Sequence, residues 1–301
     1  MEEDGRIVSF ESTELSLAYF QRYVNHGLRM LHCDPKSVSV CLALPIAYTP
    51  TYRNQIAEIL FEYMGVKSIF LASQTLLSGF SSGRPSCLVI DSGYSYTSIY
   101  GIHDLYPERS TELIYSFGGR DIDAYLMTLA GAQLKECTPA DINYIKSHFC
   151  TVASKPLSES TSQKSAIQFQ TYQLPDGQEL KLSTELELAP ELIFNSALNG
   201  HTKKPTIYAA IQKALARLSA EKSSAILKNI ICSGGNFKFK GLEARLRGDL
   251  SKSTAWNHPS GDLGVWRGGA IFASMPTFSS MAFSAKRWRE HGEIIIQKKW
   301  L

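Results

Sequence analysis

The stretch CLVIDSGYSYTSIYGI, Cys87–Ile102, decides the fold of this 301-residue chain. Its first apolar run ends in Asp91-Ser92-Gly93, and a second run then alternates polar and apolar residues, a pattern typical of two strands joined by a tight turn. An aspartate and a glycine at the end of a buried strand place a carboxylate and free backbone N–H groups at a sheet edge, where they can bind phosphate and a hydrated metal ion. An ordinary hairpin with a polar tip fits the same residues, so this motif alone does not choose between the two.

Three further glycine motifs follow in order along the chain. They are FGGRD (117–121), the apolar strand-like run IICSGG (230–235), and VWRGGAIFA (265–273). Paired glycines after an apolar run allow a backbone to approach another group closely. Together with the Asp91 motif, these stretches indicate two halves of a nucleotide cleft.

In this order, the four motifs resemble the actin family. The resemblance covers nearly the whole chain, from about Arg6 to Leu301, and includes LPDG (174–177) and the C-terminal segment Trp288–Gly292. It implies an α/β fold with two lobes around a cleft, as in the superfamily of sugar kinases, chaperone ATPases and actin. The first lobe would comprise residues 1–81 and 264–301, the base of the second lobe residues 82–117 and 201–263, and its upper subdomain residues 118–200, with hinges near Ser81–Gly83 and Leu263–Gly264.

Hydrophobic periodicity predicts helices and strands along the chain. Before residue 82 we expect helices at Phe10–Met30, Thr51–Met64 and Gln74–Phe80, and strands at Ser37–Leu44 and Ser68–Ala72. Later we expect strands at Thr111–Ser116, Phe169–Leu174 and Glu179–Leu182, and helices at Asp121–Leu129, Thr138–Val152, Pro190–Leu198, Thr206–Leu218 and Gly241–Leu250. The serine-rich stretch Ser154–Ser165 is expected to be a loop.

The resemblance also implies a set of nucleotide contacts. It assigns the second phosphate loop to Asp91, Gly93 and Thr97, with Asp91 holding Mg²⁺ through water. The adenosine side would be formed by Gly118, Gly119, Arg120, Asp121 and Lys146, and the third loop by Ser233, Gly234 and Gly235. Gln74 matches the glutamine that positions the attacking water, and a solvated helix residue is the alternative for it.

Several positions depart from the family pattern. Tyr94 stands where the family has a carboxylate near the metal, and Ser95 where it has a glycine. Ser147 replaces a glutamate, and Asp262 lies about where the family has a lysine beside the adenine. The family's first phosphate loop lies before the helix that begins here near Phe10. We therefore expect ATP or ADP with Mg²⁺ to bind weakly at best, and little or no ATPase activity.

The first lobe is expected to lack the first phosphate loop and to be incomplete. The sequence is then either a fragment or incomplete gene product, or a divergent family member whose open sheet edge is covered by a partner. Its strands Ser37–Leu44 and Ser68–Ala72 are strongly apolar, and two strands do not make a stable sheet by themselves. We expect this lobe to be the less stable one and to expose an apolar patch with free backbone donors.

Composition limits the remaining functions. The net charge of +3 is too balanced to favour nucleic acid or an anionic membrane as a partner. The acidic start MEEDGRIVSF is not a signal peptide, and the six cysteines and seven histidines show no metal-ligand spacing. We expect a cytoplasmic, cytoskeletal or nuclear protein that is not secreted.

Three functions remain open from the sequence. The first is a non-catalytic structural subunit of a multiprotein assembly, chromatin-remodelling or cytoskeletal, with other protein subunits such as actin or actin-related proteins as its partners. The second is an ATP-binding, polymerising protein with slow hydrolysis. The third is a small-molecule kinase, which would need a catalytic aspartate and a substrate pocket, and the fold alone does not choose among the three.

Overall fold

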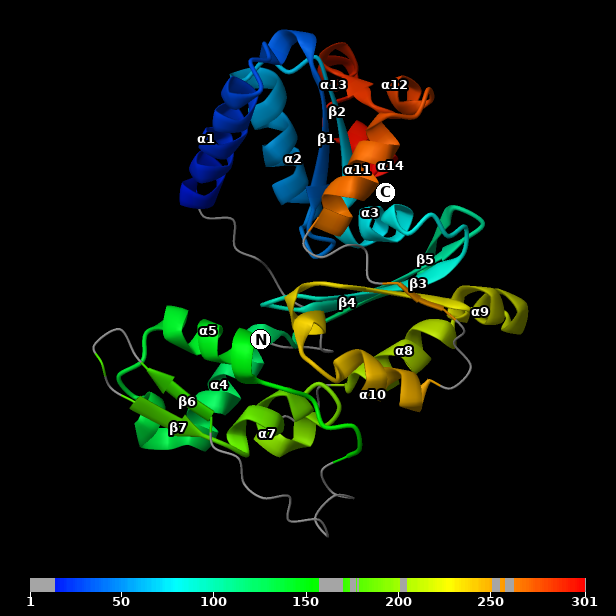
Figure 1. Ribbon diagram of the computed structural model, residues 1–301. Helices are drawn as coiled ribbons and strands as arrows, with labels where there is room; N and C mark the ends of the chain where they lie inside the picture. Colours follow the sequence, from blue (N-terminus) through cyan, green and yellow to red (C-terminus); the bar gives the residue numbers. More distant parts are fainter. Residues whose placement is uncertain are drawn as a thin grey trace.

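The computed structural model describes residues 14–156, 170–173, 177, 179–200, 205–250, 255–257 and 263–300. Two α/β lobes lie one above the other in Figure 1. The upper, first lobe contains both ends of the described chain, and the lower, second lobe contains its middle. Four expectations fall wholly or partly outside the described residues: the start of the first helix near Phe10, the loop Ser154–Ser165, the turn at Pro175-Asp176, and Asp262.

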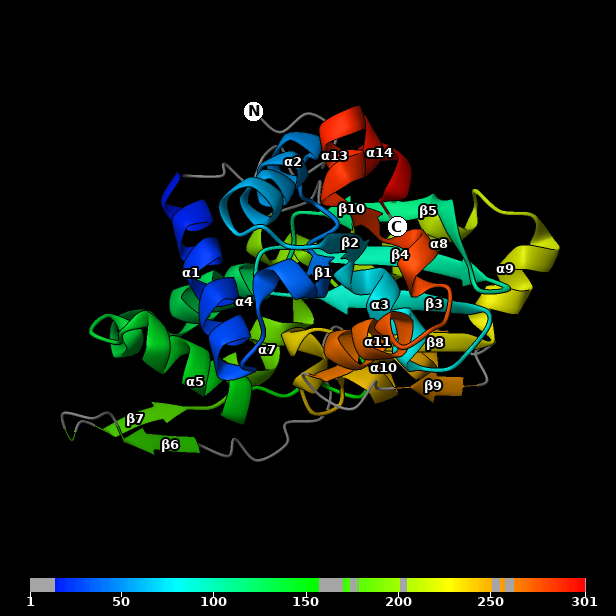
Figure 2. The same ribbon diagram turned by 90° about the horizontal axis from the view of Figure 1, so that it is seen from above.

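The first lobe is built on a three-stranded sheet of order β1-β2-β10, where β1 is Ser39–Leu44, β2 is Ser68–Ser73 and β10 is Phe283–Ser284. β1 runs parallel to β2, and β10 runs antiparallel to it. Helices α1 (Glu14–Met30) and α2 (Pro50–Glu58) cover one face, together with α13 (Ala285–His291) and α14 (Ile294–Lys299). Helices α3 (Gln74–Ser81) and α11 (Gly264–Ala273) cover the other face, as Figure 2 shows.

The second lobe has a five-stranded sheet of order β5-β4-β3-β8-β9. Its strands are β3 (Cys87–Ser92), β4 (Thr97–His103), β5 (Tyr106–Tyr115), β8 (Asn229–Ser233) and β9 (Ala255–Asn257). One face packs on α8 (Ile207–Leu215), α9 (Ala220–Leu227) and α10 (Leu242–Asp249), and the other packs on α3. Because α3 contacts both sheets, it joins the two lobes.

The second lobe has a further subdomain, at the lower left of Figure 1, which is built around α4 (Gly119–Ala130) and α5 (Pro139–Phe149). It adds the antiparallel pair β6 (Gln170–Gln173) and β7 (Glu179–Leu182), and α7 (Glu185–Glu191). Thr138 caps α5 in a capping box with Asp141. Short 3₁₀ turns lie at Pro35–Ser37, Gly131–Leu134, Ser196–Asn199 and Gly235–Lys238.

Some expected elements differ from the structure. The helix expected at Thr51–Met64 is an α-helix up to Glu58 and then a π-helix at Ile59–Tyr63. The helix expected at Pro190–Leu198 differs more, because the observed helix α7 ends at Glu191 and Pro190 lies in its last turn. The prediction of only two strands in the first lobe was wrong, because Phe283 and Ser284 pair with β2. Elements with weak periodicity were missed: α9, β9, α12 (Phe278–Met281), α13 and α14.

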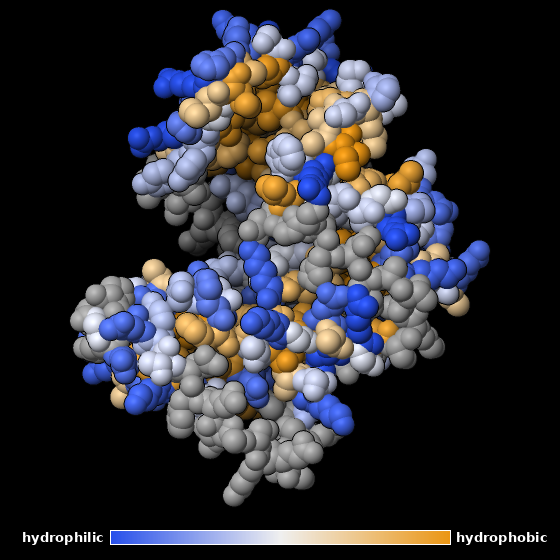
Figure 3. All heavy atoms as spheres, in the orientation of Figure 1, coloured by the Kyte–Doolittle hydropathy of each residue, from blue (hydrophilic) through white to orange (hydrophobic). Residues whose placement is uncertain are grey.

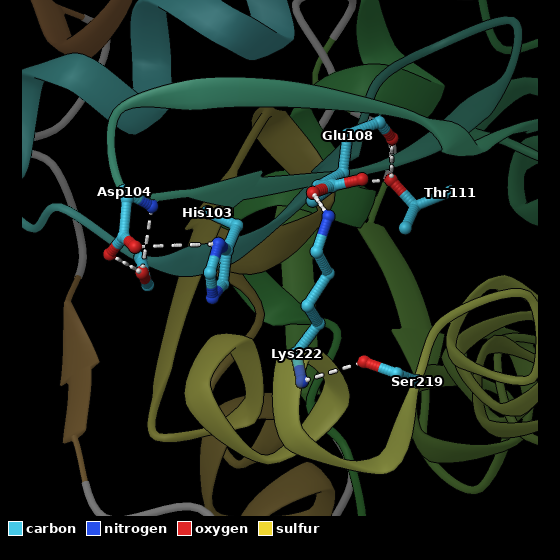
Figure 4. A network of polar contacts seen from close by, with 8 residues as sticks. His103, Asp104, Glu108, Thr111, Ser219 and Lys222 are labelled. Atoms are coloured by element: carbon cyan, nitrogen blue, oxygen red, sulfur yellow. Dashed lines mark hydrogen bonds and ion pairs between the residues drawn. The ribbon is translucent and has the colours of Figure 1, made fainter.

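A polar network fixes the far end of the β4–β5 hairpin (Figure 4). Asp104 and Leu105 form its turn with positive φ values of 50° and 67°. The Asp104 backbone N–H donates to the Ser86 hydroxyl at 3.0 Å, and the Lys222 ammonium of α9 forms an ion pair with Glu108 of β5. The network therefore ties the hairpin to Ser86, the residue before β3, and to α9.

Candidate functional site

The loop between β3 and β4 is closed by its own hydrogen bonds. The Gly93 N–H donates to the Tyr96 carbonyl at 3.0 Å, which makes the tight turn that the sequence predicted. The Ser92 and Thr97 hydroxyls lie 2.8 Å apart, and the Thr97 hydroxyl donates to the Phe117 carbonyl at 2.9 Å. Thr97 therefore anchors this loop to the segment that leads into α4.

The first N–H groups of α4 also bond to this loop. Gly119 N–H donates to the Gly93 carbonyl and Arg120 N–H to the Tyr94 carbonyl, each at 2.9 Å. The Asp121 carboxylate accepts from Gly118 N–H at 2.9 Å. A side chain at Gly118 would overlap the Tyr94 carbonyl, so the close approach requires glycine there. The helix N-terminus that could bind an anion is bonded to oxygens of this chain itself.

Asp91, at the end of β3, is buried with 6% of its surface exposed. The Gln74 amide donates to its Oδ2 at 2.9 Å and to the Tyr96 hydroxyl at 3.1 Å. Burial raises the pKa of Asp91, and the hydrogen bonds from Gln74 and Ser233 offset part of this rise. Gln74 is therefore not a solvated surface residue, because both donors of its amide are used inside the protein.

Lys146 of α5 is buried beside Tyr94. Its ammonium lies 2.9 Å from the Asp123 carboxylate, 3.3 Å from the Gly119 carbonyl and 5.2 Å from the centre of the Tyr94 ring. A cation over an aromatic face is attracted by the ring quadrupole. Lys146, which the resemblance assigns to the nucleotide, is therefore paired with the Asp123 carboxylate and lies against the ring of Tyr94.

The third loop approaches from β8. Gly234 has a φ of 92°, and a side chain there would overlap the Ser92 carbonyl. The Asn236 amide donates to the Ser92 hydroxyl and to the Gly93 carbonyl, each at 2.9 Å. Asn236 is 4% exposed, so this buried amide holds the second and third loops together.

The structure thus brings most of the expected residues to one place. Gathered around the β3–β4 loop are Gln74, Asp91, Gly93, Thr97, Gly118, Gly119, Asp121, Lys146, Ser233 and Gly234. Gly235 and the Arg120 side chain are exposed, and Gly235 has open space beside it. Gly268 lies elsewhere, packed on the Leu77 carbonyl of α3, and Ser147 bonds to its own helix.

Sequence reasoning missed three residues of the site: Tyr96, Asp123 and Asn236. A signal existed for two of them. A lysine in a helix with buried neighbours needs a carboxylate partner, and Asp123 follows Asp121 on α4. Asn236 directly follows the glycine pair. For Tyr96, the alternating pattern indicated a place in the second strand-like run but gave no sign of its bond to Gln74.

The described residues fit a tightly bound magnesium nucleotide poorly. Asp91 is the carboxylate at the expected metal position, one of its oxygens accepts from Gln74, and Tyr94 supplies no second carboxylate. Among the described residues, no group of three or more His, Cys, Asp or Glu side chains is placed to hold a metal ion. In the same part of the chain, no helix has the length and apolar character needed to cross a membrane.

Comparison with known proteins finds relatives of this chain. A family model for actin matches residues 3–142 and 136–301. Actin-like protein 9 of Homo sapiens is 28% identical over 310 residues, which cover 98% of this chain and 72% of the relative. Actin-like protein 8 of Homo sapiens is 27% identical over 314 residues, covering 96% and 81%. Actin-like protein 7A of Rattus norvegicus is 28% identical over 274 residues, covering 88% and 62%.

Proposed function

The chain belongs to the actin family, and we propose that it is an actin-related protein that acts as a non-catalytic structural subunit of a multiprotein assembly. Its relatives are actin-like proteins, and its α/β lobes have the architecture of that fold. In this proposal ATP or ADP with Mg²⁺ binds weakly at best, and hydrolysis is negligible.

One observation carries the proposal: two polar side chains that the resemblance assigns to the nucleotide site, Gln74 and Lys146, are bonded to other groups of the protein. The Gln74 amide is held by Asp91 and Tyr96. The Lys146 ammonium is held by Asp123 and lies against Tyr94. A nucleotide would have to replace these contacts, so each interaction it gained would be offset by one that the protein lost.

The lost contacts are large enough to matter. A hydrogen bond to a charged group contributes about 1.5–3 kcal/mol, which corresponds to about one to two decades of affinity. Tyr94 removes one carboxylate from the metal side, and Ser95 adds a side chain where the backbone would approach phosphate. Two such losses would reduce a tight site to a marginal one.

Isothermal titration of the full chain with Mg-ATP tests this proposal. We expect a dissociation constant weaker than about 10 μM, or no measurable heat, as the loss of two charged contacts implies. Submicromolar affinity would overturn the proposal. The release of inorganic phosphate under the same conditions should not exceed that of a buffer control.

The alternative is an ATP-binding actin-like protein that polymerises and hydrolyses slowly. The observation that favours it is that Gln74 and Asp91 lie 2.9 Å apart, so the glutamine expected to position water lies beside the carboxylate expected to hold the metal. Sedimentation of the chain with and without Mg-ATP separates the two functions, because only the alternative requires nucleotide-dependent pelleting.

The proposed partners are other protein subunits, among them actin or actin-related proteins, in the cytoplasm or the nucleus. We propose neither direct nucleic-acid nor membrane binding, since the chain's net charge is only +3. Purification of the chain from its own cells, followed by mass spectrometry, tests this. Recovery of stoichiometric protein subunits supports a structural role, and recovery of the chain alone contradicts it.

A further inference from the structure

The strand β1 lies at the end of the first-lobe sheet. Among the described residues it pairs with β2 and with no other strand. An edge strand presents a row of backbone N–H and C=O groups that another strand can bind. Its apolar side chains at Val40, Leu42 and Ala43 are only partly buried.

An apolar groove runs beside this edge. Figure 3 shows apolar atoms gathered in a hollow of the upper lobe over β1 and α2, between α1 and α11. The cavity has a volume of about 560 Å³, and its lining includes Tyr19 and Tyr23 of α1, Leu42 and Ala43 of β1, and Tyr48 and Ile56. None of its described lining residues is charged. A hollow of this kind is suited to apolar side chains.

The flank of the groove is basic. Residues 17–31, which include most of α1, contain Arg22, His26 and Arg29 but no aspartate or glutamate. All three basic side chains are exposed, and Arg22 and His26 are helical neighbours of Tyr19 and Tyr23 because residues three apart lie on one face. An acidic segment would therefore be attracted to this side of the sheet edge.

We propose that this groove and the β1 edge bind an extended segment of another protein, one that has apolar residues at alternate positions and a net negative charge. The segment adds a strand beside β1, so its backbone groups pair with the edge of β1 that carries no other strand among the described residues. Its alternate apolar side chains enter the hollow between α1 and β1. The inference deepens the proposed function, since it names a surface through which a structural subunit would be held. Its test reads peptide binding and not nucleotide binding, so the two can fail separately.

Three synthetic peptides of about six residues, a typical strand length, test the proposal on the full chain. The first alternates valine and glutamate, the second alternates valine and lysine, and the third is the first with methylated backbone nitrogens. Fluorescence anisotropy should detect binding of the first peptide and, at the same concentrations, little or none of the other two. Equal binding of the methylated peptide would overturn strand addition, and equal binding of the lysine peptide would overturn the charge argument.

Variants locate the binding surface. Tyr23→Asp should weaken binding of the valine–glutamate peptide about tenfold, because it places a like charge in the groove. Tyr106→Asp is the matched control, since Tyr23 and Tyr106 are both 75% exposed and Tyr106 lies in the second lobe. Arg22→Glu and Arg287→Glu form a second pair, in which only the first should weaken binding. Equal effects within either pair would overturn the assignment to this groove.

Two other occupants would give distinct results, and either would overturn the proposal. If a second copy of the chain fills the groove, sedimentation should show a dimer that Tyr23→Asp dissociates. If residues 1–13 fill it, the valine–glutamate peptide should bind the full chain only after the substitutions Ile7→Asp and Phe10→Asp.

Discussion

The Gln74 amide nitrogen lies 2.9 Å from a carboxylate oxygen of Asp91. Gln74 begins α3, the helix that contacts both sheets, and Asp91 ends the central strand β3. Their hydrogen bond therefore joins the connecting helix to the second lobe at the point where the nucleotide loops meet. Gln74, which the resemblance matches to a water-positioning glutamine, is here bonded within the site.

Asp91→Asn should stabilise the protein at neutral pH. Burial raises the pKa of Asp91 above that in the unfolded chain, so the folded state binds this proton more tightly. The stability that this residue contributes is present below the unfolded pKa and is lost as pH rises through the folded pKa. The Asp91→Asn variant has no ionisable group at this position, so it should not lose this stability as the pH rises. We expect its Tm at pH 7 to rise by about 2–4 °C, with a smaller difference near pH 3. Glu136→Gln, at an exposed position, is the control.

Tyr94→Asp combined with Ser95→Gly should increase affinity for Mg-ATP. The pair restores a carboxylate and a bare backbone in the loop and removes the ring that lies against Lys146. We expect a gain of about tenfold in titration calorimetry, the value of one charged contact. Tyr63→Asp, at an exposed tyrosine in the first lobe, should leave the affinity unchanged. An unchanged affinity in the double variant would show that Tyr94 does not limit the site.

Gly268→Ala should destabilise the packing of α11 on α3, because the added methyl group would overlap the Leu77 carbonyl. Overpacking of this kind lowers the free energy of unfolding by about 1–3 kcal/mol. The adjacent Gly269→Ala is a matched control, since its methyl group would meet the Leu77 side chain at 3.7 Å, an ordinary contact. Urea unfolding measures both, and equal losses would contradict the packing argument.

Lys146→Met should lower the free energy of unfolding by about 3–5 kcal/mol, because it leaves the Asp123 carboxylate buried without its partner. The Lys146 and Asp123 side chains are 7% and 13% exposed, so water screens the pair little. Replacement of both residues, Lys146→Met with Asp123→Leu, should recover most of the loss. If the double variant is no more stable than the single one, the ion pair is not the source of the effect.

Amides of β1 should exchange with deuterium faster than those of β3. β1 is an edge strand, whereas β3 lies between β4 and β8 at the centre of its sheet. Groups at an edge open with a lower free energy than those in a central strand. Hydrogen exchange of the monomeric chain measures this directly. Equal protection of Ser39–Leu44 and Cys87–Ser92 would show that the first lobe is as stable as the second.

The sequence predicted the parts of the fold that have strong local patterns. The β3–β4 hairpin and the helices α1, α3, α4 and α8 lie within a few residues of their expected bounds, since apolar periodicity and capping residues mark them. The two-residue strand β10 has no such pattern. Its pairing with Ile69 depends on a contact between distant parts of the chain, which local reasoning does not reach.

The site was predictable in its composition but not in its bonding. The glycines at positions 118 and 234 were expected at the nucleotide site from the family resemblance, and the structure places both against carbonyl oxygens of the β3–β4 loop region. That Lys146 would bind Asp123 and face Tyr94 depends on how α4 and α5 pack. The sequence showed that Tyr94 replaced a carboxylate, but not that its ring would lie over the lysine.

The first lobe is assembled from the two ends of the chain, and this sets the order in which it can form during synthesis. Phe61 and Phe283 lie in one core, with their rings 5.7 Å apart, and Phe283 is synthesised only after the whole second lobe. Chains emerge N-terminus first, and contacts between distant residues form late. During synthesis the N-terminal part of the first lobe therefore lacks the C-terminal residues that complete its core, while the second lobe, whose residues are continuous in the sequence, can already fold. Chaperones should therefore bind the apolar residues of this N-terminal part during synthesis.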